Sequence, residues 1–314
     1  MRNYLTIILC LCTLPCSAKQ LSFFREEQDS QIQFHYVWQD REQQTHQLDV
    51  KFDKGVFFDA FRTFKLYRPE VANRYSMMAM RKQASQIDAR DANIKVSQSG
   101  DNISLSIRSR HPDNIPKWQQ QFQQIQRDSF NQYLADNYYI EFENALRQTG
   151  VKPDHVKFAQ QSQELLKPLV ESFNKLSGDK PDKRKTIELV LSWVQSIPYD
   201  LLEDRLNSNG SGYSPPNKLI ADNKGDCDSK AVLTAALLHG LFPDMPIVYI
   251  FLPEHALLGI SIKHTKEESV FMYDGKDYFY LEPTGPALFE IGEISAESQR
   301  AIGNNQHQFE PVIF

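Results

Sequence analysis

The chain has 314 residues, of which 41% are hydrophobic and 24% charged, and its formal net charge at pH 7 is -5. A chain of this length and composition can bury one or two hydrophobic cores, which argues against disorder over its whole length. Its acidic balance provides no basic field for nucleic acid or anionic lipid, so we expect neither as a partner.

Residues 1–18, MRNYLTIILCLCTLPCSA, have the pattern of an export signal, with a basic start and an apolar run over 5–14. That run is about half of the roughly 20 residues that a membrane-spanning helix needs. We therefore expect cleavage after Ala18, export to the periplasm or the medium, and no membrane span in the mature chain. Lipid attachment at Cys16 is the weaker alternative, because Pro15 stands where a small residue is expected.

Signal cleavage would leave a single cysteine. Cys10, Cys12 and Cys16 would leave with the signal, so Cys227 would have no partner within the chain. A lone thiol in an oxidising compartment invites wrong disulfides, which makes its retention informative. The alternative is a buried cysteine that serves only as a small hydrophobic residue.

The N-terminal part of the mature chain, 19–110, is expected to be a small mixed α/β unit. Apolar residues alternate over 32–38 as in a strand, and 57–66 is an aromatic-rich helix or irregular segment. Residues 93–108 are typical of a hairpin that turns at Ser-Gly-Asp-Asn. None of these segments carries a recognisable chemical motif.

A helical linker region is expected over 111–180. Apolar spacing predicts one helix over 117–150 and a second over 153–178, each closed by a glycine. The second helix should be kinked at Pro168. A third helix, over 185–197, begins the next domain.

The C-terminal domain, 181–314, contains a helix predicted over 227–239. Asp226 is a suitable N-cap, Gly240 lies just past the expected end, and the segment is apolar nearly all round, as in a buried central helix. Cys227 would lie in its first turn, where free backbone N–H groups favour a thiolate and can donate to an oxyanion. The acidic Asp226 and Asp228 work against a thiolate, so a cationic partner is required.

Three strands are expected after this helix, over 247–253, 256–264 and 278–283. His255 stands at the start of the second strand and Glu282 at the end of the third. An imidazole there could face the thiolate, while a carboxylate holds the other ring nitrogen.

Four segments carry a family resemblance: WVQSIPY (193–199), GDCDSKA (225–231), His255-Ala256 and LEPT (281–284). In this order and spacing they resemble the transglutaminase-like superfamily, a branch of the papain-like cysteine-protease fold, in its bacterial exported members. The resemblance covers roughly residues 185–295. It implies an α+β fold in which a central helix packs on an antiparallel sheet, after the helical linker and the N-terminal unit.

The resemblance also implies a chemistry. Cys227 would be the nucleophile, His255 the general base and acid, and Glu282 the residue that orients the imidazole. The thiolate would attack an amide of a peptide or protein, including wall peptides, and form an acyl thioester. Water would then give hydrolysis or deamidation, and an amine would give acyl transfer. An exported cysteine peptidase, amidase or acyltransferase is therefore expected.

Three further residues are candidates for the oxyanion site or the cleft: Trp193, Asp228 and Tyr213. Trp193 corresponds to an upstream tryptophan that assists the oxyanion in eukaryotic relatives, but its helix also favours a core position. The chain departs from the family in using Glu282 where aspartate is commoner, and in lacking a tryptophan two residues after His255. Both departures leave the substrate open.

Other interpretations of the same residues remain. His255 could be a structural strand-end histidine, Glu282 could cap a turn with Thr284, and Asp274 and Asp277 are rival carboxylates next to a predicted Asp-Gly turn. The remaining histidines lack zinc-ligand spacing, and no metal or cofactor is expected.

The whole domain could also be an inactive module of this fold that binds peptides or proteins. A wall amidase of another papain-like family fits the LEPT segment less well.

Overall fold

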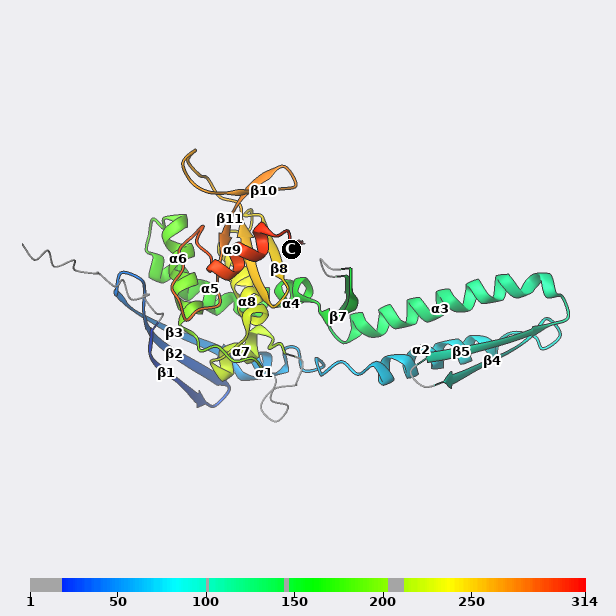
Figure 1. Cartoon of the computed structure of the whole chain (residues 1–314). Coiled ribbons are helices and arrows are strands. Elements are labelled where there is room, and N and C mark those ends of the chain that lie inside the picture. Colours follow the sequence, from blue (N-terminus) through cyan, green and yellow to red (C-terminus); the bar gives the residue numbers. More distant parts are fainter. Residues whose placement is uncertain (1–18, 100–101, 144–146, 203–211) are drawn as a thin grey trace, which may run out of the picture.

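The computed structural model describes residues 19–99, 102–143, 147–202 and 212–314, so the predicted signal lies outside the described residues. It is a mixed structure of helices and antiparallel sheets, with a body from which a long arm extends (Figure 1). Within the described residues, no helix is both long and apolar enough to cross a membrane.

The body is built on a five-stranded antiparallel sheet in the order β10-β11-β9-β8-β12. The strands are β8 (Ile247–Leu252), β9 (His255–Ile260), β10 (Phe271–Tyr273), β11 (Lys276–Leu281) and β12 (Gln308–Val312). The predicted Asp-Gly turn joins β10 to β11, with positive φ angles of 46° at Asp274 and 72° at Gly275.

Helix α8 (Cys227–Leu241) packs against β8 and β9 and is buried on nearly every side, as its apolar sequence predicts. The helices around it are α4 (His155–Gln161), α5 (Gln163–Ser177), α6 (Lys183–Ser196) and α7 (Pro216–Asp222). Helix α9 (Ala296–Gly303) contacts β8. The N-terminus of α8 lies beside the sheet, next to the start of β9, whose first residue is His255.

A second antiparallel sheet, β1-β2-β3, packs onto the same body. It consists of β1 (Lys19–Gln28), β2 (Gln31–Gln39) and β3 (Thr45–Asp53), and is followed by α1 (Lys54–Asp59). Alternate residues of β2 point inward, so that Tyr36 meets Trp193 of α6 edge to face at 5.3 Å and Trp38 Nε1 donates to Ser192 Oγ at 3.0 Å. The N-terminal sheet and the C-terminal helices thus share one hydrophobic core.

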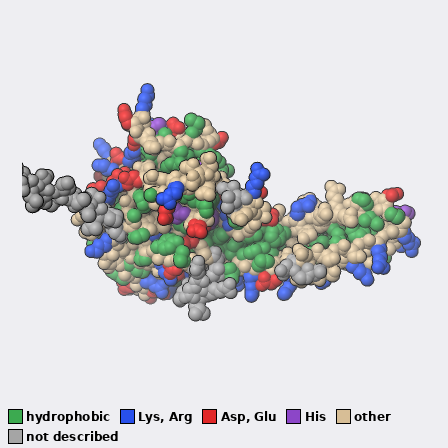
Figure 2. Space-filling view, in the orientation of Figure 1, with side chains coloured by type: hydrophobic (Ala, Val, Ile, Leu, Met, Phe, Trp, Pro, Cys, Tyr) green, Lys and Arg blue, Asp and Glu red, His purple; other side chains and the backbone are tan. Residues whose placement is uncertain are grey.

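The arm has its own small core. It contains α2 (Pro69–Ala84), the hairpin β4 (Ala92–Ser99) and β5 (Asn102–Ser109), a short 3₁₀ turn (Pro112–Asn114) and α3 (Ile115–Asp136). Met80, Val96 and Phe122 form its centre. The arm projects from the body with Lys and Arg side chains spread along it (Figure 2). The expected division at residue 110 falls inside the arm, between β5 and α3.

The helix predicted over 117–150 is wrong in its second half. Helix α3 ends at Asp136, and the chain then forms the hairpin of β6 (Tyr139–Glu143) and β7 (Thr149–Pro153). Tyr138 adopts a left-handed conformation (φ 63°) that no continuous helix allows. Gly150 therefore lies in a strand, against the ring of Phe142, instead of closing a helix.

The second predicted helix is interrupted at Ser162, between α4 and α5, and Pro168 lies inside α5. Its closing glycine, Gly178, has the expected positive φ of 78°. Helix α8 runs two residues beyond the expected end at 239, so Gly240 lies within the helix, against Val170.

Candidate active site

The N-terminus of α8 holds Cys227 in a fixed place. The Asp226 carboxylate caps the helix by accepting a hydrogen bond from the Ser229 backbone N–H at 3.0 Å, as the sequence predicts. Cys227 is the next residue in the chain and is 8% exposed. Its thiol borders a cavity of about 570 Å³ that His255 also lines. The nucleophile candidate and the base candidate therefore share one cavity.

His255 and Glu282 are brought together by two neighbouring strands. Because β11 pairs with β9, a residue at the start of β9 lies near one just past β11. The His255 Nε2 atom is 2.7 Å from Glu282 Oε1, and Glu282 is only 2% exposed. The second carboxylate oxygen accepts a hydrogen bond from Ser298 Oγ at 3.4 Å. Of the rival carboxylates, Asp277 contacts His264 instead, at 3.1 Å.

The thiol of Cys227 donates its hydrogen bond to Asp228 Oδ1, at 3.5 Å. Among the described residues, no hydrogen bond joins Cys227 to His255. Burial raises the pKa of the Cys227 thiol, as do the charges of Asp228 and Asp226, while the backbone N–H of Ala256 works to lower it. The thiol is therefore protonated in this resting arrangement.

A histidine for which the sequence predicts no role in the site lies on the other side of Asp228. His155, the first residue of α4, is 1% exposed, and its Nε2 is 3.4 Å from Asp228 Oδ2. This separation is that of an ion pair and is too long for a strong hydrogen bond. Because the contact joins segments distant in sequence, no local motif could have revealed it.

Lys230 is a second buried group beneath the site. It lies one turn after Cys227, is 0% exposed, and donates from Nζ to the carbonyls of Ile197 at 2.5 Å and Thr284 at 2.6 Å. Burial lowers the pKa of Lys230 to about 7, while the carboxyl groups of Asp226 and Glu282 work to raise it. Its bonds connect the end of α6 to the loop that follows Glu282.

The two aromatic candidates lie in the interior. Trp193 is fully buried between Tyr36 and Phe173 and does not line the cavity at Cys227. We therefore assign it a packing role and no oxyanion role. Tyr213 is 2% exposed and lies 5.3 Å from the His155 ring, centroid to centroid, behind the cavity wall.

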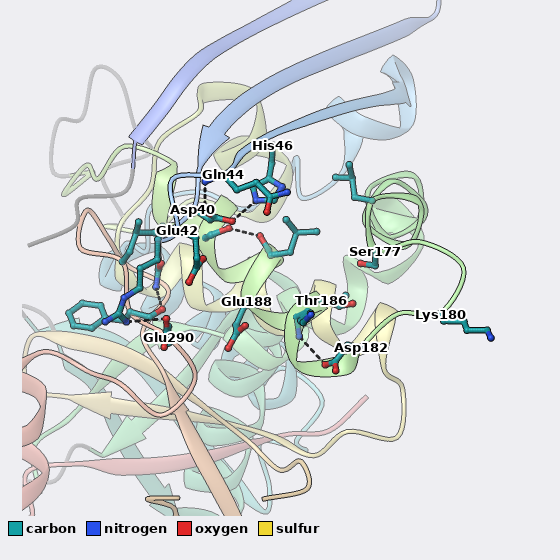
Figure 3. A pocket seen from close by; sticks show the side chains of 18 residues that line it. Asp40, Glu42, Gln44, His46, Ser177, Lys180, Asp182, Thr186, Glu188 and Glu290 are labelled. Atoms are coloured by element: carbon teal, nitrogen blue, oxygen red, sulfur yellow. Dashed lines mark hydrogen bonds and ion pairs between the residues drawn. The ribbon is translucent and has the colours of Figure 1, made fainter.

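A second cavity, of about 610 Å³, lies between α6 and the β2–β3 turn (Figure 3). Glu42, Glu188 and Glu290 line it, and burial together with the other two carboxylates raises the pKa of Glu188. None of the predicted catalytic residues lines it, so we do not place the chemistry there. One of its lining residues contacts the candidate site: Gln195 Nε2 donates a hydrogen bond to the backbone carbonyl of Glu282 at 2.8 Å. Across the described ranges, no cluster of His, Cys or carboxylate side chains is arranged to hold a metal ion.

The buried N-cap makes a testable contribution to stability. Burial, with the charge of Asp228, raises the pKa of Asp226 from 3.8 to about 7. Between these two pKa values the native state binds a proton that the unfolded chain has lost. The contribution of Asp226 to the free energy of unfolding is therefore greatest below about pH 4 and is lost as the pH rises through 7. Asp226→Asn keeps the cap without the charge. We expect the variant to exceed wild type in free energy of unfolding at pH 8, by on the order of 1 kcal/mol or more.

Urea denaturation of both proteins at pH 4 and pH 8 measures this effect. The difference between them should disappear at pH 4. An equal difference at the two pH values would contradict the shifted carboxyl.

No protein-family model matches the chain, and no curated protein sequence does. Among solved structures, an EGTA-treated form of Legionella pneumophila LapG is similar to this chain. The similarity spans 50% of this chain and 77% of LapG, at 18% sequence identity and a TM-score of 0.27.

Proposed function

We propose that the protein is an exported thiol enzyme that acts on amide bonds of peptides or proteins, with Cys227, His255 and Glu282 as its catalytic residues. The observation that carries the proposal is the buried His255–Glu282 pair, 2.7 Å apart, at the cavity that also holds Cys227 at a helix N-terminus. The transglutaminase-like core is part of this proposal, and the central helix packed on an antiparallel sheet supports it.

The geometry supports the following proton transfers. Because Glu282 occupies Nε2 of His255, the Nδ1 atom is left to accept the thiol proton of Cys227. The thiolate then attacks the amide carbonyl, and the backbone N–H of Cys227 at the start of α8 can donate to the developing oxyanion. The amine leaves with the proton from His255. Water, deprotonated by the same ring, cleaves the acyl thioester, or an amine takes the acyl group.

The first step requires the thiol to exchange its hydrogen-bond partner. In the resting arrangement its proton is directed at Asp228, at 3.5 Å. The buried Glu282 favours the protonated ring of His255 by supplying a negative charge at its far side. We therefore propose that substrate binding, which displaces water from the cavity, turns the thiol from Asp228 toward His255.

An inactive peptide-binding module is the second candidate. The specific observation in its favour is the raised pKa of Cys227, together with its bond to a carboxylate instead of an imidazole. A module of this kind would keep the cavity and lose any dependence of thiol reactivity on His255.

The rate of Cys227 alkylation by iodoacetamide, measured from pH 4 to 10, distinguishes the two candidates. For the enzyme, His255→Ala should slow alkylation at pH 6 by about tenfold, because the thiolate loses its imidazolium partner. His264→Ala is the matched control, since His264 also contacts a carboxylate but lies on the surface. Equal rates in wild type and His255→Ala at every pH would leave the binding module as the explanation.

A further inference from the structure

We propose that His155 is a positioning residue for the nucleophile: it holds the carboxylate of Asp228 in the ion pair that decides how readily Cys227 gives up its proton. The catalytic consequence rests on the proposed function, but the ion pair and its effect on the thiol do not.

Asp228 is placed between two groups that use different oxygens. Its Oδ1 accepts the thiol proton of Cys227 at 3.5 Å, and its Oδ2 is 3.4 Å from His155 Nε2. Rotation of the carboxylate would break both contacts together. The ring of His155 therefore controls the direction in which Oδ1 faces the thiol.

The His155 ring is itself held rigidly. It stacks on Phe251 at 5.3 Å and lies 5.3 Å from Tyr213 and 6.0 Å from Tyr249, between ring centroids. Neither ring nitrogen has a well-formed hydrogen bond among the described residues. Burying such a group without a good hydrogen bond destabilises the fold, whereas an apolar ring would fill the same space without that cost. A polar ring kept here at a cost to stability indicates a role beyond packing.

Four other charged groups near the thiol have partners of their own. They are Asp226, which caps α8; Lys230, bonded to two carbonyls; Lys152, paired with Glu310; and His255, paired with Glu282. Glu254 lines the same cavity. In the described part of the chain, His155 is the one base in direct contact with Asp228.

The electrostatic consequence follows from this arrangement. Burial works to raise the pKa of Asp228, but the contact with His155, together with the Cys227 hydrogen bond and the charge of Lys152, outweighs it and holds that pKa below its ordinary value. The ionised carboxylate opposes thiolate formation at Cys227, and the contact of His155 with Oδ2 offsets part of that opposition. Without His155, the negative charge of Asp228 would act on the thiol with less compensation.

The test is a double-mutant cycle on the mature chain, with His155→Gln, Asp228→Asn and the double variant. The readout is the pH profile of Cys227 alkylation by iodoacetamide. His155→Gln should slow alkylation at pH 7 by roughly three- to tenfold, and Asp228→Asn should accelerate it by a similar factor. If His155 acts through Asp228, the double variant should match Asp228→Asn. Equal slowing by His155→Gln in both backgrounds, or no slowing in either, would overturn the proposal.

A second measurement covers the case in which His155→Gln does not fold. In Asp228→Asn, which leaves the buried ring in place, the NMR shifts of the His155 ring nitrogens should differ from wild type across pH 5 to 8. Unchanged shifts would exclude the ion pair. This outcome is independent of the proposed enzyme activity, which fails only if alkylation in wild type ignores His255.

Discussion

Glu282→Gln should slow the acylation of Cys227 without abolishing it, and should lose most of the turnover. With p-nitrophenyl acetate as the probe, Cys227 should still take the acetyl group in a burst of p-nitrophenolate, because an activated ester needs no proton for its leaving group. The burst should be slower than in wild type, since the thiol still gives its proton to His255. Hydrolysis of the acetyl-thioester needs a ring that accepts a proton from water. A neutral amide in place of the carboxylate, 2.7 Å from Nε2, no longer stabilises the protonated ring. We expect the steady-state rate after the burst to fall roughly 10²- to 10⁴-fold.

The burst and the steady state are separated by following p-nitrophenolate release at substoichiometric and excess ester. Glu267→Gln, in the exposed loop before β10, is the matched control and should behave as wild type. Equal steady-state rates in wild type and Glu282→Gln would show that Glu282 only supports the end of β11. A burst that survives in Cys227→Ser would show that another group is acylated.

The parts of the site that the sequence predicts are those marked by local signals. The Asp274-Gly275 turn sets the register of β10 and β11, and β9 begins just after a short apolar strand. These signals predict that the start of β9 and the end of β11 lie close together in the sheet. The N-cap of α8 is equally local, since Asp226 needs only the Ser229 N–H. Together these signals predict where Cys227, His255 and Glu282 lie along their elements.

The parts that the sequence does not predict depend on contacts between distant segments. His155 and Asp228 meet because α4 packs on α8, and nothing around either residue specifies that packing. The helix predicted over 117–150 failed for a related reason. Residues 139–143 keep apolar positions that suit a helix or a strand, and pairing with β7 decides between them.

Lys230→Met should weaken the body of the protein, and more so at high pH. The substitution keeps the length of the side chain but leaves the carbonyls of Ile197 and Thr284 without donors in a site that is 0% exposed. Each buried acceptor that loses its partner costs about 1–3 kcal/mol, so we expect the free energy of unfolding at pH 9 to fall by about 2–4 kcal/mol.

The pH dependence has a definite sign. Burial lowers the pKa of Lys230 from 10.5 to about 7, so between these values the unfolded chain binds more protons than the native protein. The stability from this group is therefore fully present above about pH 10.5 and is lost as the pH falls through 7. Methionine does not titrate, so Lys230→Met should lower the free energy of unfolding less at pH 6 than at pH 9.

Guanidinium denaturation at both pH values measures this difference. Lys175→Met, on the exposed face of α5, is the control and should stay within about 0.5 kcal/mol of wild type. If Lys230→Met lowers the free energy of unfolding equally at both pH values, Lys230 keeps its proton throughout. Its pKa would then not be shifted, and hydrogen bonding alone would connect α6 to the loop after Glu282.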